Sequence, residues 1–437
     1  MLAVSVQPPF LVALNLTRRC NLRCAHCYLD AGIRADGGTG ELSTDEVKGL
    51  LDSLAALGDG IMVVFTGGEP MLRRDLETLT HHAAGRGLMA VVGTNGMMLD
   101  DDRVARLKNA GVAGVGISLD SLDPGYHDAF RGAPGAWHKT MAGIDACRRG
   151  KLPFQIHFSV TDDNAAELEE MVEFARLSEA MALNVFFLVC TGRGESVTNI
   201  SRDTYEDVMR RVTRAAHEER TLMVRAKCAP HFKRMAIELD PSWPVTLAHG
   251  YEAGGCLAGT RYCRVTPEGD VTPCPYIETS VGSLRDSGFV EIWRDAPMFQ
   301  DLRAPKLTGR CGACEYRKLC GGCRARPWAR NGDLMAEDFL CAYEPQDGAV
   351  IEPMALPEAS LAWSPEAEQR LGRVPGFARK MVRRRVEDYV RRLGERQVRP
   401  EHMRTLVKKR FGDAGPPATG TGATGAWGSL QSPGDRR

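Results

Sequence analysis

The sequence predicts an α/β fold, followed by a cysteine-rich segment and a small all-α C-terminal domain. Apolar runs alternate with amphipathic stretches over residues 1–220, eight cysteines gather between residues 256 and 341, and apolar residues recur at helical spacing within residues 362–412. Apolar strands that alternate with amphipathic helices indicate βα units and a parallel sheet. The chain contains six such units by this pattern.

The expected strands are short apolar runs. They are Leu11–Thr17, Ile61–Phe65, Ala90–Thr94, Val112–Leu119, Phe154–Val160 and Leu183–Val189. The first helix is expected from Ser43, which can cap it together with Glu46. The other expected helices are Asp75–Arg86, Asp100–Ala110, Trp137–Arg149, Asn164–Ser178 and Ser201–Glu219. Because barrel enzymes carry their chemistry at the carboxyl ends of parallel strands, polar residues there are candidate site residues.

The most informative motif is Cys20-x₃-Cys24-x₂-Cys27, directly after the first expected strand. Three thiolates this close can hold three irons of a [4Fe–4S] cube and leave the fourth iron open to a small chelating ligand. Ligation by four cysteines would suit an electron carrier, whereas ligation by three suggests a catalyst. A zinc knuckle or three buried thiols are the alternatives for the spacing alone.

This spacing resembles that of the radical S-adenosylmethionine (SAM) enzymes, and a second motif strengthens the resemblance. Gly67, Gly68, Glu69 and Pro70 follow the second strand; glycines allow close backbone approach, and a carboxylate can accept from an ammonium. In that superfamily the open iron chelates SAM, and the G-G-E-P segment holds its amino group. The resemblance implies a partial (β/α)₆ barrel and cleavage of SAM to a 5′-deoxyadenosyl radical, which removes a hydrogen atom from the substrate.

Further candidates lie at the ends of later strands. The family analogy makes Asn95, Ser118 and Asp120 candidates for binding the SAM ribose or the substrate, although each can simply cap a strand end. Arg193, within Thr191–Gly194, can bind a carboxylate of SAM or substrate through two parallel hydrogen bonds. A solvated loop arginine is the alternative for this residue.

Composition limits the other possibilities. The 437 residues allow two or three domains, and a formal net charge of zero gives no general attraction to nucleic acid or membranes. We find no apolar run near the roughly 20 residues that span a bilayer, and no signal peptide. Fourteen cysteines in such a chain favour metal binding in a reducing cytoplasm over disulfides.

The cysteine-rich segment resembles the SPASM extension of radical SAM enzymes, which carries auxiliary [4Fe–4S] clusters. Eight thiolates suffice for two fully ligated cubes. The resemblance implies that one cluster is held by Cys256, Cys263, Cys274 and Cys323, and the other by Cys311, Cys314, Cys320 and Cys341. A zinc ribbon is disfavoured because five residues separate the two C-x₂-C pairs, against roughly 12–20 in zinc modules. Cys147, Cys190 and Cys228 fit no pattern.

The tetrapyrrole branch of the superfamily is suggested by local similarities. Cys274 is followed by Pro275 and Tyr276, where sulfatase-maturing relatives carry an aspartate. The segments His26–Gly32, Thr191–Gly194 and Cys256–Tyr276 instead resemble the radical SAM enzymes of haem d1 and alternative haem biosynthesis. This resemblance implies action on acetate or propionate side chains of an iron porphyrinoid.

Two other functions remain open. A peptide maturase would be expected to carry an N-terminal recognition domain, for which the roughly ten residues before the first strand leave no room. An electron-transfer or cluster-scaffold protein would need neither an open cluster site nor Glu69.

Beyond a SPASM region at residues 221–345 and a linker at residues 346–361, residues 362–412 form a basic helical module. Ser364 and Pro365 begin its first helix, and the module resembles the C-terminal domain of the light-independent protochlorophyllide reductase B subunit. It holds 15 Lys and Arg against 6 Asp and Glu. It could bind substrate carboxylates, dock a ferredoxin or flavodoxin, or be only a solvated cap. Residues 413–437, rich in Gly, Thr and Pro, are expected to be disordered.

Overall fold

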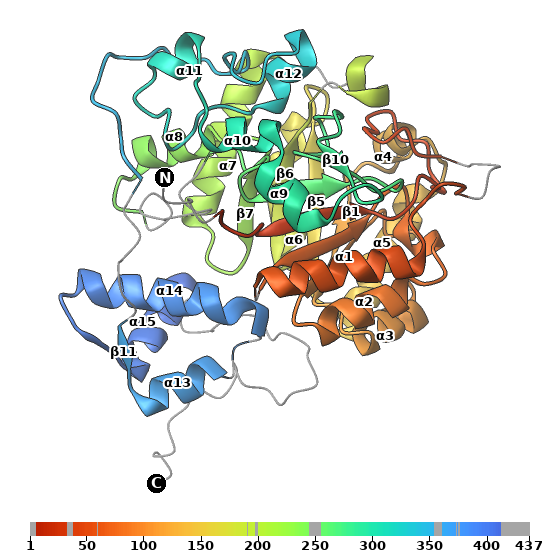
Figure 1. The fold of residues 1–437 in the computed structure, drawn as a ribbon, viewed down its shortest axis with the longest axis horizontal. Helices are drawn as coiled ribbons and strands as arrows, with labels where there is room; N and C mark the ends of the chain where they lie inside the picture. The colour runs from red at the N-terminus through yellow and green to blue at the C-terminus, as the bar shows by residue number, and fades with distance from the viewer. Residues whose placement is uncertain are drawn as a thin grey trace.

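The structure is a computed structural model that describes residues 6–32, 38–58, 60–189, 191–196, 200–243, 255–353, 361–372, 374 and 376–411. Its centre is a ten-stranded sheet with the order β10-β9-β8-β1-β2-β3-β4-β5-β6-β7 (Figure 1). The first seven strands are β1 (Leu11–Asn15), β2 (Met62–Thr66), β3 (Met89–Thr94), β4 (Gly114–Ser118), β5 (Phe154–Val160), β6 (Ala182–Phe187) and β7 (Met223–Lys227). All seven pair in parallel with their neighbours.

Six βα units are therefore present, as the alternating pattern predicts. The connecting helices are α1 (Thr44–Leu57), α2 (Leu76–Gly85), α3 (Asp101–Asn109), α4 (Pro124–Arg131), α5 (Ala136–Gly150), α6 (Leu168–Leu177) and α7 (Arg202–Glu218). The capping box at the start of α1 is confirmed, because Ser43 and Glu46 exchange side-chain and backbone hydrogen bonds. Strand β7 and helix α4 are additions that the sequence pattern did not predict.

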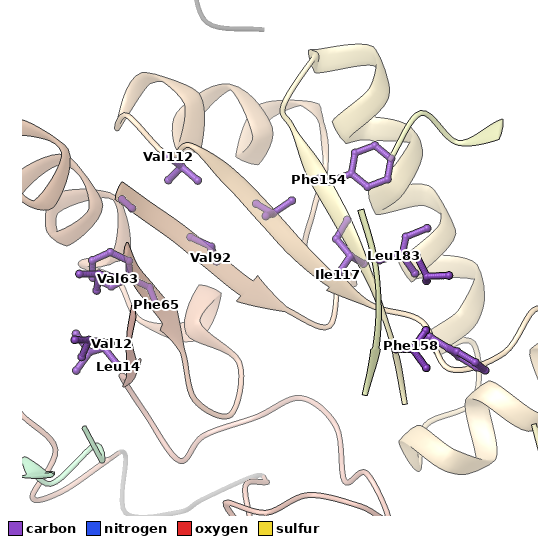
Figure 2. Packing of buried hydrophobic residues seen from close by; sticks show 14 of the residues in the cluster. Val12, Leu14, Val63, Phe65, Val92, Val112, Ile117, Phe154, Phe158 and Leu183 are labelled. Carbon is purple, nitrogen blue, oxygen red and sulfur yellow. The ribbon is translucent and has the colours of Figure 1, made fainter. Parts of the chain in front are cut away.

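The main core lies between the sheet and these helices. Alternate strand residues, such as Val12 and Leu14 on β1 or Phe154 and Phe158 on β5, point into one buried cluster. Figure 2 shows members of this cluster on strands from β1 to β6. The period of two therefore sets which strand residues face the helices and which face the opposite side of the sheet.

The opposite face of the sheet carries polar side chains. Asn184 on β6 donates to Gln155 Oε1 on β5 at 2.7 Å, and the His157 ring lies 5.1 Å from that of Phe186. On β7, Lys227 pairs in register with Phe186 and so lies on this same face. Because this face is polar while the other is packed with apolar side chains, it is the side on which a polar substrate can be bound.

The cysteine-rich region continues the sheet rather than forming a separate layer. Strand β8 (Tyr262–Val265) pairs in parallel with β1, and β9 (Asp270–Thr272) and β10 (Gly282–Ser283) follow in antiparallel pairing. The helices of this region are α8 (Phe232–Leu239), α9 (Phe289–Asp295), α10 (Pro297–Arg303), α11 (Gly309–Ala313) and α12 (Ala325–Asn331). The barrel sheet thus extends past residue 220, where the first domain was expected to end.

The C-terminal module has a small core of its own. It consists of β11 (Ala362–Trp363), α13 (Pro365–Gly372), α14 (Gly376–Arg392), β12 (Gln397–Val398) and α15 (Pro400–Phe411), drawn in blue in Figure 1. The Ser364 hydroxyl accepts from Ala367 N at 3.2 Å, which confirms the expected cap. The parallel pair β11–β12 corrects the all-α expectation. Residues 413–437 and part of the linker lie outside the described residues.

Within the described part of the chain, every helix is too short or too polar to cross a membrane.

Candidate active site and auxiliary cysteine sites

The loop with Cys20, Cys24 and Cys27 leaves the carboxyl end of β1. Its base is closed by two backbone hydrogen bonds: Cys20 N donates to Gly32 O at 2.9 Å, and Gly32 N donates to Arg18 O at 3.2 Å. Cys20 and Cys24 are buried, and Cys27 is half-buried. Burial raises the pKa of Cys20 to about 12.

Each sulfur of this loop accepts a hydrogen bond. Leu22 N donates to Cys20 at 3.4 Å. Arg131 Nη1 donates to Cys24 at 3.6 Å, and Ala31 N donates to Cys27 at 3.4 Å. Donors directed at sulfur orient metal-binding thiolates and tune the metal that they hold. The donor chemistry and the spacing of the three thiols therefore fit the three-thiolate cluster that the sequence predicts.

The two glycines of the G-G-E-P segment pack against the backbone of this loop. Gly68 N donates to Thr17 O at 2.7 Å, and Glu69 N donates to Arg19 O at 2.8 Å. A Cβ added to Gly68 would lie 2.2 Å from Arg19 O, and Gly67 has a φ of +136°. Both positions therefore require glycine. The glycines allow this segment to approach the backbone of the cysteine loop closely.

The Glu69 side chain is buried and hydrogen-bonded within the protein. It is fully buried and accepts from Met71 N at 3.1 Å, from the Thr94 hydroxyl at 2.9 and 3.0 Å and from Asn95 N at 3.0 Å. Pro70 follows as the first residue of a short 3₁₀ turn. Burial raises the pKa of Glu69. Its carboxylate ties the G-G-E-P turn to the end of β3, and its contact with the SAM ammonium stays a prediction.

Asn95 links the end of β3 to the cysteine loop. Its Nδ2 donates to Asn21 Oδ1 at 2.7 Å, and its carbonyl oxygen accepts from the Thr140 hydroxyl at 2.9 Å. Ser118, the last residue of β4, is half-buried. Both therefore lie at the strand edge where the sequence predicts them, and Asn95 is already bonded to the loop.

Asp120 is the partner of a buried arginine. Its Oδ2 forms an ion pair with Arg131, and its Oδ1 accepts from Ser159 N at 3.0 Å. Burial alone would raise the pKa of Asp120, but the charges of Arg131, His26 and His127 together with the hydrogen bond from Ser159 N hold that pKa below its usual value. Because Arg131 also donates to Cys24, Asp120 contacts the cysteine loop through Arg131, and its contact with ribose or substrate stays a prediction.

Arg131 ends α4, a helix that sequence reasoning missed although its signals are present. Asp123 caps the helix by accepting from two backbone N–H groups, Pro124 is its first residue, and Gly132 ends it in the left-handed conformation. The helix packs against the loop, where His26 stacks on Phe130 with ring centroids 4.3 Å apart. A search for a proline-initiated helix between β4 and α5 would have found it.

Arg193 also holds the cysteine loop. It donates from Nε to Cys24 O at 3.1 Å and from Nη2 to Ala31 O at 2.9 Å, and it pairs with Asp30. The guanidinium fixes the backbone on both sides of Cys27. A contact of Arg193 with a carboxylate of SAM or substrate stays a prediction.

Comparisons with known proteins agree with this geometry. The profile of the radical SAM superfamily matches residues 14–175, and that of the SPASM iron-sulfur cluster-binding domain matches residues 256–324. The AdoMet-dependent heme synthase of Methanosarcina barkeri is 39% identical over 343 residues, which cover 77% of this chain and 97% of that protein. This chain belongs to the radical SAM superfamily. It is a radical SAM enzyme whose cofactors are a [4Fe–4S] cluster, SAM and auxiliary iron–sulfur clusters.

Other relatives are less similar. The pre-heme d1 synthase of Dinoroseobacter shibae is 32% identical over 76% of this chain and 86% of that protein. The PqqA peptide cyclase of Granulibacter bethesdensis is 27% identical over 78% of this chain and 89% of that protein. Residues 363–406 match the profile named Proto-chlorophyllide reductase 57 kD subunit.

The fold also resembles a solved structure. Streptococcus suis SuiB bound to S-adenosylmethionine superposes with a TM-score of 0.61 at 17% identity, over 77% of this chain and 78% of SuiB. At this low identity the similarity supports the radical SAM fold and no more.

In the SPASM region, one group of cysteines lines a pocket. The four lining cysteines are the expected second set, Cys311, Cys314, Cys320 and Cys341. Three of their sulfurs accept backbone hydrogen bonds at 3.4 Å. Cys311 accepts from Asp338 N. Cys314 accepts from Tyr316 N, and Cys320 accepts from Gly322 N. The structure therefore brings this set together around a space with the donor chemistry of a cluster site.

The other expected set is only partly assembled. Cys274 and Cys323 share one buried cluster with Cys256 packed against it, and the Cys256 and Cys323 thiols are hydrogen-bonded to each other. Cys263 instead belongs to the main core. Cys228, which fits no sequence pattern, packs against the group in its place. Of the remaining cysteines, Cys147 is a buried core residue, and Cys190 lies outside the described residues.

Among the described residues, no three His, Cys, Asp or Glu side chains converge closely enough to hold one metal ion.

Proposed function

We propose that this radical SAM enzyme modifies the acetate or propionate side chains of an iron porphyrinoid. The observation that carries the proposal is the 39% identity to a heme synthase over 97% of its length. The 32% identity to pre-heme d1 synthase supports the same substrate class.

The residues assigned to the first cluster are Cys20, Cys24 and Cys27. When bound, this cluster and SAM supply the 5′-deoxyadenosyl radical that removes a hydrogen atom from the substrate side chain. The protein holds the loop from three directions, through Gly68, Arg193 and the Asp120–Arg131 pair. Eleven thiolates in three sets would hold three cubes, or about twelve irons.

The SAM amino group is assigned to the backbone of Gly67–Pro70. Backbone atoms suit this role because the Glu69 carboxylate is already bonded to three protein groups. Asn95 and Ser118 remain candidates for the ribose or the substrate, since both lie at the carboxyl edge of the sheet. Asp120 and Arg193 are positioning residues for the cysteine loop in this assignment.

Lys227 is a candidate to bind a carboxylate of the porphyrinoid. It ends β7 on the polar face of the sheet, and no carboxylate of the described residues pairs with its ammonium. Burial, helped by the charge of Arg225, lowers the pKa of Lys227 to about 8. A half-buried cation without an anionic partner among the described carboxylates favours an anionic ligand, because pairing offsets its partial desolvation.

The proposed function is tested by anaerobic incubation of the reconstituted enzyme with SAM, dithionite and candidate iron porphyrinoids. We expect 5′-deoxyadenosine and a porphyrinoid product whose mass shows the loss of CO₂ or of the whole substituent. The Cys20→Ala, Cys24→Ala, Cys27→Ala variant is the control and should form neither product. Turnover of a peptide with no change in any porphyrinoid would instead support a peptide maturase, the function suggested by the 27% identity to a PqqA peptide cyclase.

Lys227→Met should weaken binding of a carboxylate-bearing porphyrinoid by about 1.5–3 kcal/mol, the value of a hydrogen bond to a charged group. Lys227→Arg is the matched control, since it keeps the positive charge and should retain binding. Equal affinity of Lys227→Met and wild type, measured by absorbance titration, would contradict the assignment.

The enzyme also needs a source of electrons for its clusters. We assign delivery of electrons to a ferredoxin or flavodoxin in the cytoplasm, where reducing conditions keep cysteines as free thiols. The basic C-terminal module is the candidate docking site, although Arg383 is already paired with Glu368 and Arg391 with Glu387. The side chains of Arg384 and Arg392 lie outside the described residues. The binding capacity of the module therefore rests on fewer arginines than its net charge suggests.

A further inference from the structure

We propose that Cys228, rather than Cys263, is the fourth thiolate of the auxiliary cluster held by Cys256, Cys274 and Cys323. This inference rests on the assignment of auxiliary clusters to the SPASM region and is independent of the substrate. Neither the C-x₂-C spacing nor the SPASM match at residues 256–324 includes Cys228.

The first observation is the position of Cys263 on β8. In the parallel pair of β1 and β8, Cys263 is in register with Val12, and both residues are fully buried in the main core. Its neighbours on the strand, Tyr262 and Arg264, point to the other side, where Arg264 lies 5.9 Å from the Tyr28 ring. Because successive strand residues face opposite sides, Cys263 points away from the side that carries Tyr28.

The electrostatic surroundings agree with this placement. Burial raises the pKa of Cys263, and Arg303 is the only charged group of the described residues that acts on it. Arg303 packs over the Trp293 ring at 4.5 Å, within the apolar surroundings of α9 and α10. A cluster ligand would instead lie next to the other ligand cysteines.

The second observation is the position of Cys228, directly after β7. Cys228 packs against the same buried cluster as Cys274 and Cys323. The Cys228 thiol lies within electrostatic range of the thiols of Cys323 and Cys274. Together with the hydrogen bond between Cys256 and Cys323, these contacts join four thiols into one group.

The third observation is the way in which the backbone of Cys228 is held. Its φ is +56°, a left-handed conformation that non-glycine residues rarely adopt and that is enriched at functional sites. Its carbonyl oxygen accepts from Arg326 Nη2 at 2.7 Å. Arg326 lies three residues after Cys323 and pairs with Asp338 at 2.9 Å, and Asp338 in turn accepts from Cys323 N at 2.8 Å. The same buried ion pair therefore fixes Cys228 and Cys323 relative to each other.

The test compares Cys228→Gly with Cys263→Val in the full-length chain that also carries Cys20→Ala, Cys24→Ala and Cys27→Ala. Glycine relieves the positive φ at position 228, and valine fits a buried strand, so neither change should prevent folding. Iron and sulfide per chain and the EPR spectra of the oxidised and reduced protein are measured after anaerobic reconstitution. The background should hold about eight irons in two cubes.

Cys228→Gly should lose about four of these irons, or show the EPR signal of a three-iron cluster in the oxidised state. Cys263→Val should keep all eight irons and the wild-type spectra. The inference is overturned if Cys228→Gly keeps the full complement, or if Cys263→Val loses iron. Neither result depends on whether the enzyme acts on porphyrinoids, so a failed substrate test and a failed ligand test are distinguishable.

Discussion

The barrel cysteine site and the auxiliary site around Cys323 are built in opposite ways. The first takes its three thiols from the eight residues Cys20–Cys27. The second gathers Cys256 before β8, Cys274 after β9 and Cys323 before α12, with Cys228 after β7 as its proposed fourth member. The spacing of cysteines along the sequence identifies cluster ligands reliably when one loop supplies them all. Where several segments converge, this spacing identifies the region but not every cysteine ligand.

Each site contains its own buried Arg–Asp pair. The residue of the pair that contacts the cysteine is the arginine in one site and the aspartate in the other. In the barrel, Arg131 touches the Cys24 sulfur, and Asp120 balances the charge of the arginine. In the SPASM region, Asp338 accepts from Cys323 N at 2.8 Å, and Arg326 balances the carboxylate. Asp338 N also donates to Cys311 at 3.4 Å. Asp338 therefore connects the two auxiliary cysteine groups, whereas Asp120 serves one loop.

The largest effect should come from removing the barrel thiols. Replacement of Cys20, Cys24 and Cys27 by Ala should abolish SAM cleavage and remove about four of about twelve irons. Replacement of Cys311, Cys314 and Cys320 by Ala should also remove about four irons but leave dithionite-driven SAM cleavage. Metal analysis and 5′-deoxyadenosine formation measure the two effects. Zinc in place of iron, or about four irons in the whole wild-type chain, would contradict the division into three sites.

The next effect should come from breaking the buried ion pairs. Asp120→Ala and Asp338→Ala each leave an unpaired buried arginine and should lower the free energy of unfolding by about 3–5 kcal/mol. Asp338→Ala should be the more damaging, because Asp338 accepts from two backbone donors, Cys323 N and Leu340 N, whereas Asp120 accepts from one, Ser159 N. Denaturant unfolding of the cluster-free protein measures both.

The matched control for these variants is Glu173→Ala. It breaks an exposed pair with Arg176 on α6, and exposed pairs contribute little to stability. Equal stability of Asp338→Ala and Glu173→Ala would show that the buried pair near Cys323 does not hold the auxiliary site together.

A smaller effect is expected at Glu69. Glu69→Gln places an amide NH₂ where the carboxylate accepts from Met71 N and Asn95 N, so at least one buried donor loses its acceptor. We expect a loss of about 1–3 kcal/mol in unfolding free energy, the cost of an unsatisfied buried polar group. SAM affinity is measured on the same sample. Weaker SAM binding with unchanged stability would restore the ammonium-binding role that the sequence suggests.

The smallest effect on SAM chemistry should come from removing the C-terminal module. Truncation after Pro353 should leave iron content and dithionite-driven SAM cleavage unchanged, because both cysteine regions lie before that residue. It should reduce porphyrinoid affinity or turnover with a ferredoxin, and either effect should weaken as salt rises, because exposed charges are screened over about 8–10 Å. If the truncated and full-length enzymes match in both assays, the module is only a structural cap.

Features that depend on local patterns were predicted from the sequence. Short apolar runs located all six predicted strands within two residues of their ends, because buried strands read as short apolar runs bounded by turns. The capping residues Ser43 and Ser364 were identified from spacing alone, since a cap acts within one helical turn. The motif Cys20–Cys27 and its family assignment were equally local.

Only the tertiary structure decided what the polar and cysteine side chains contact. The carboxylates of Glu69 and Asp120 bind protein donors, and Arg193 binds backbone carbonyls, because burial at the strand edge requires each of them to be paired within the fold. The direction of Cys263 is set by the register of β8 against β1, strands about 250 residues apart in the chain. Cys228 comes beside Cys323 only because β7 extends the sheet past the sixth unit. Such pairings depend on long-range packing, which no local spacing encodes.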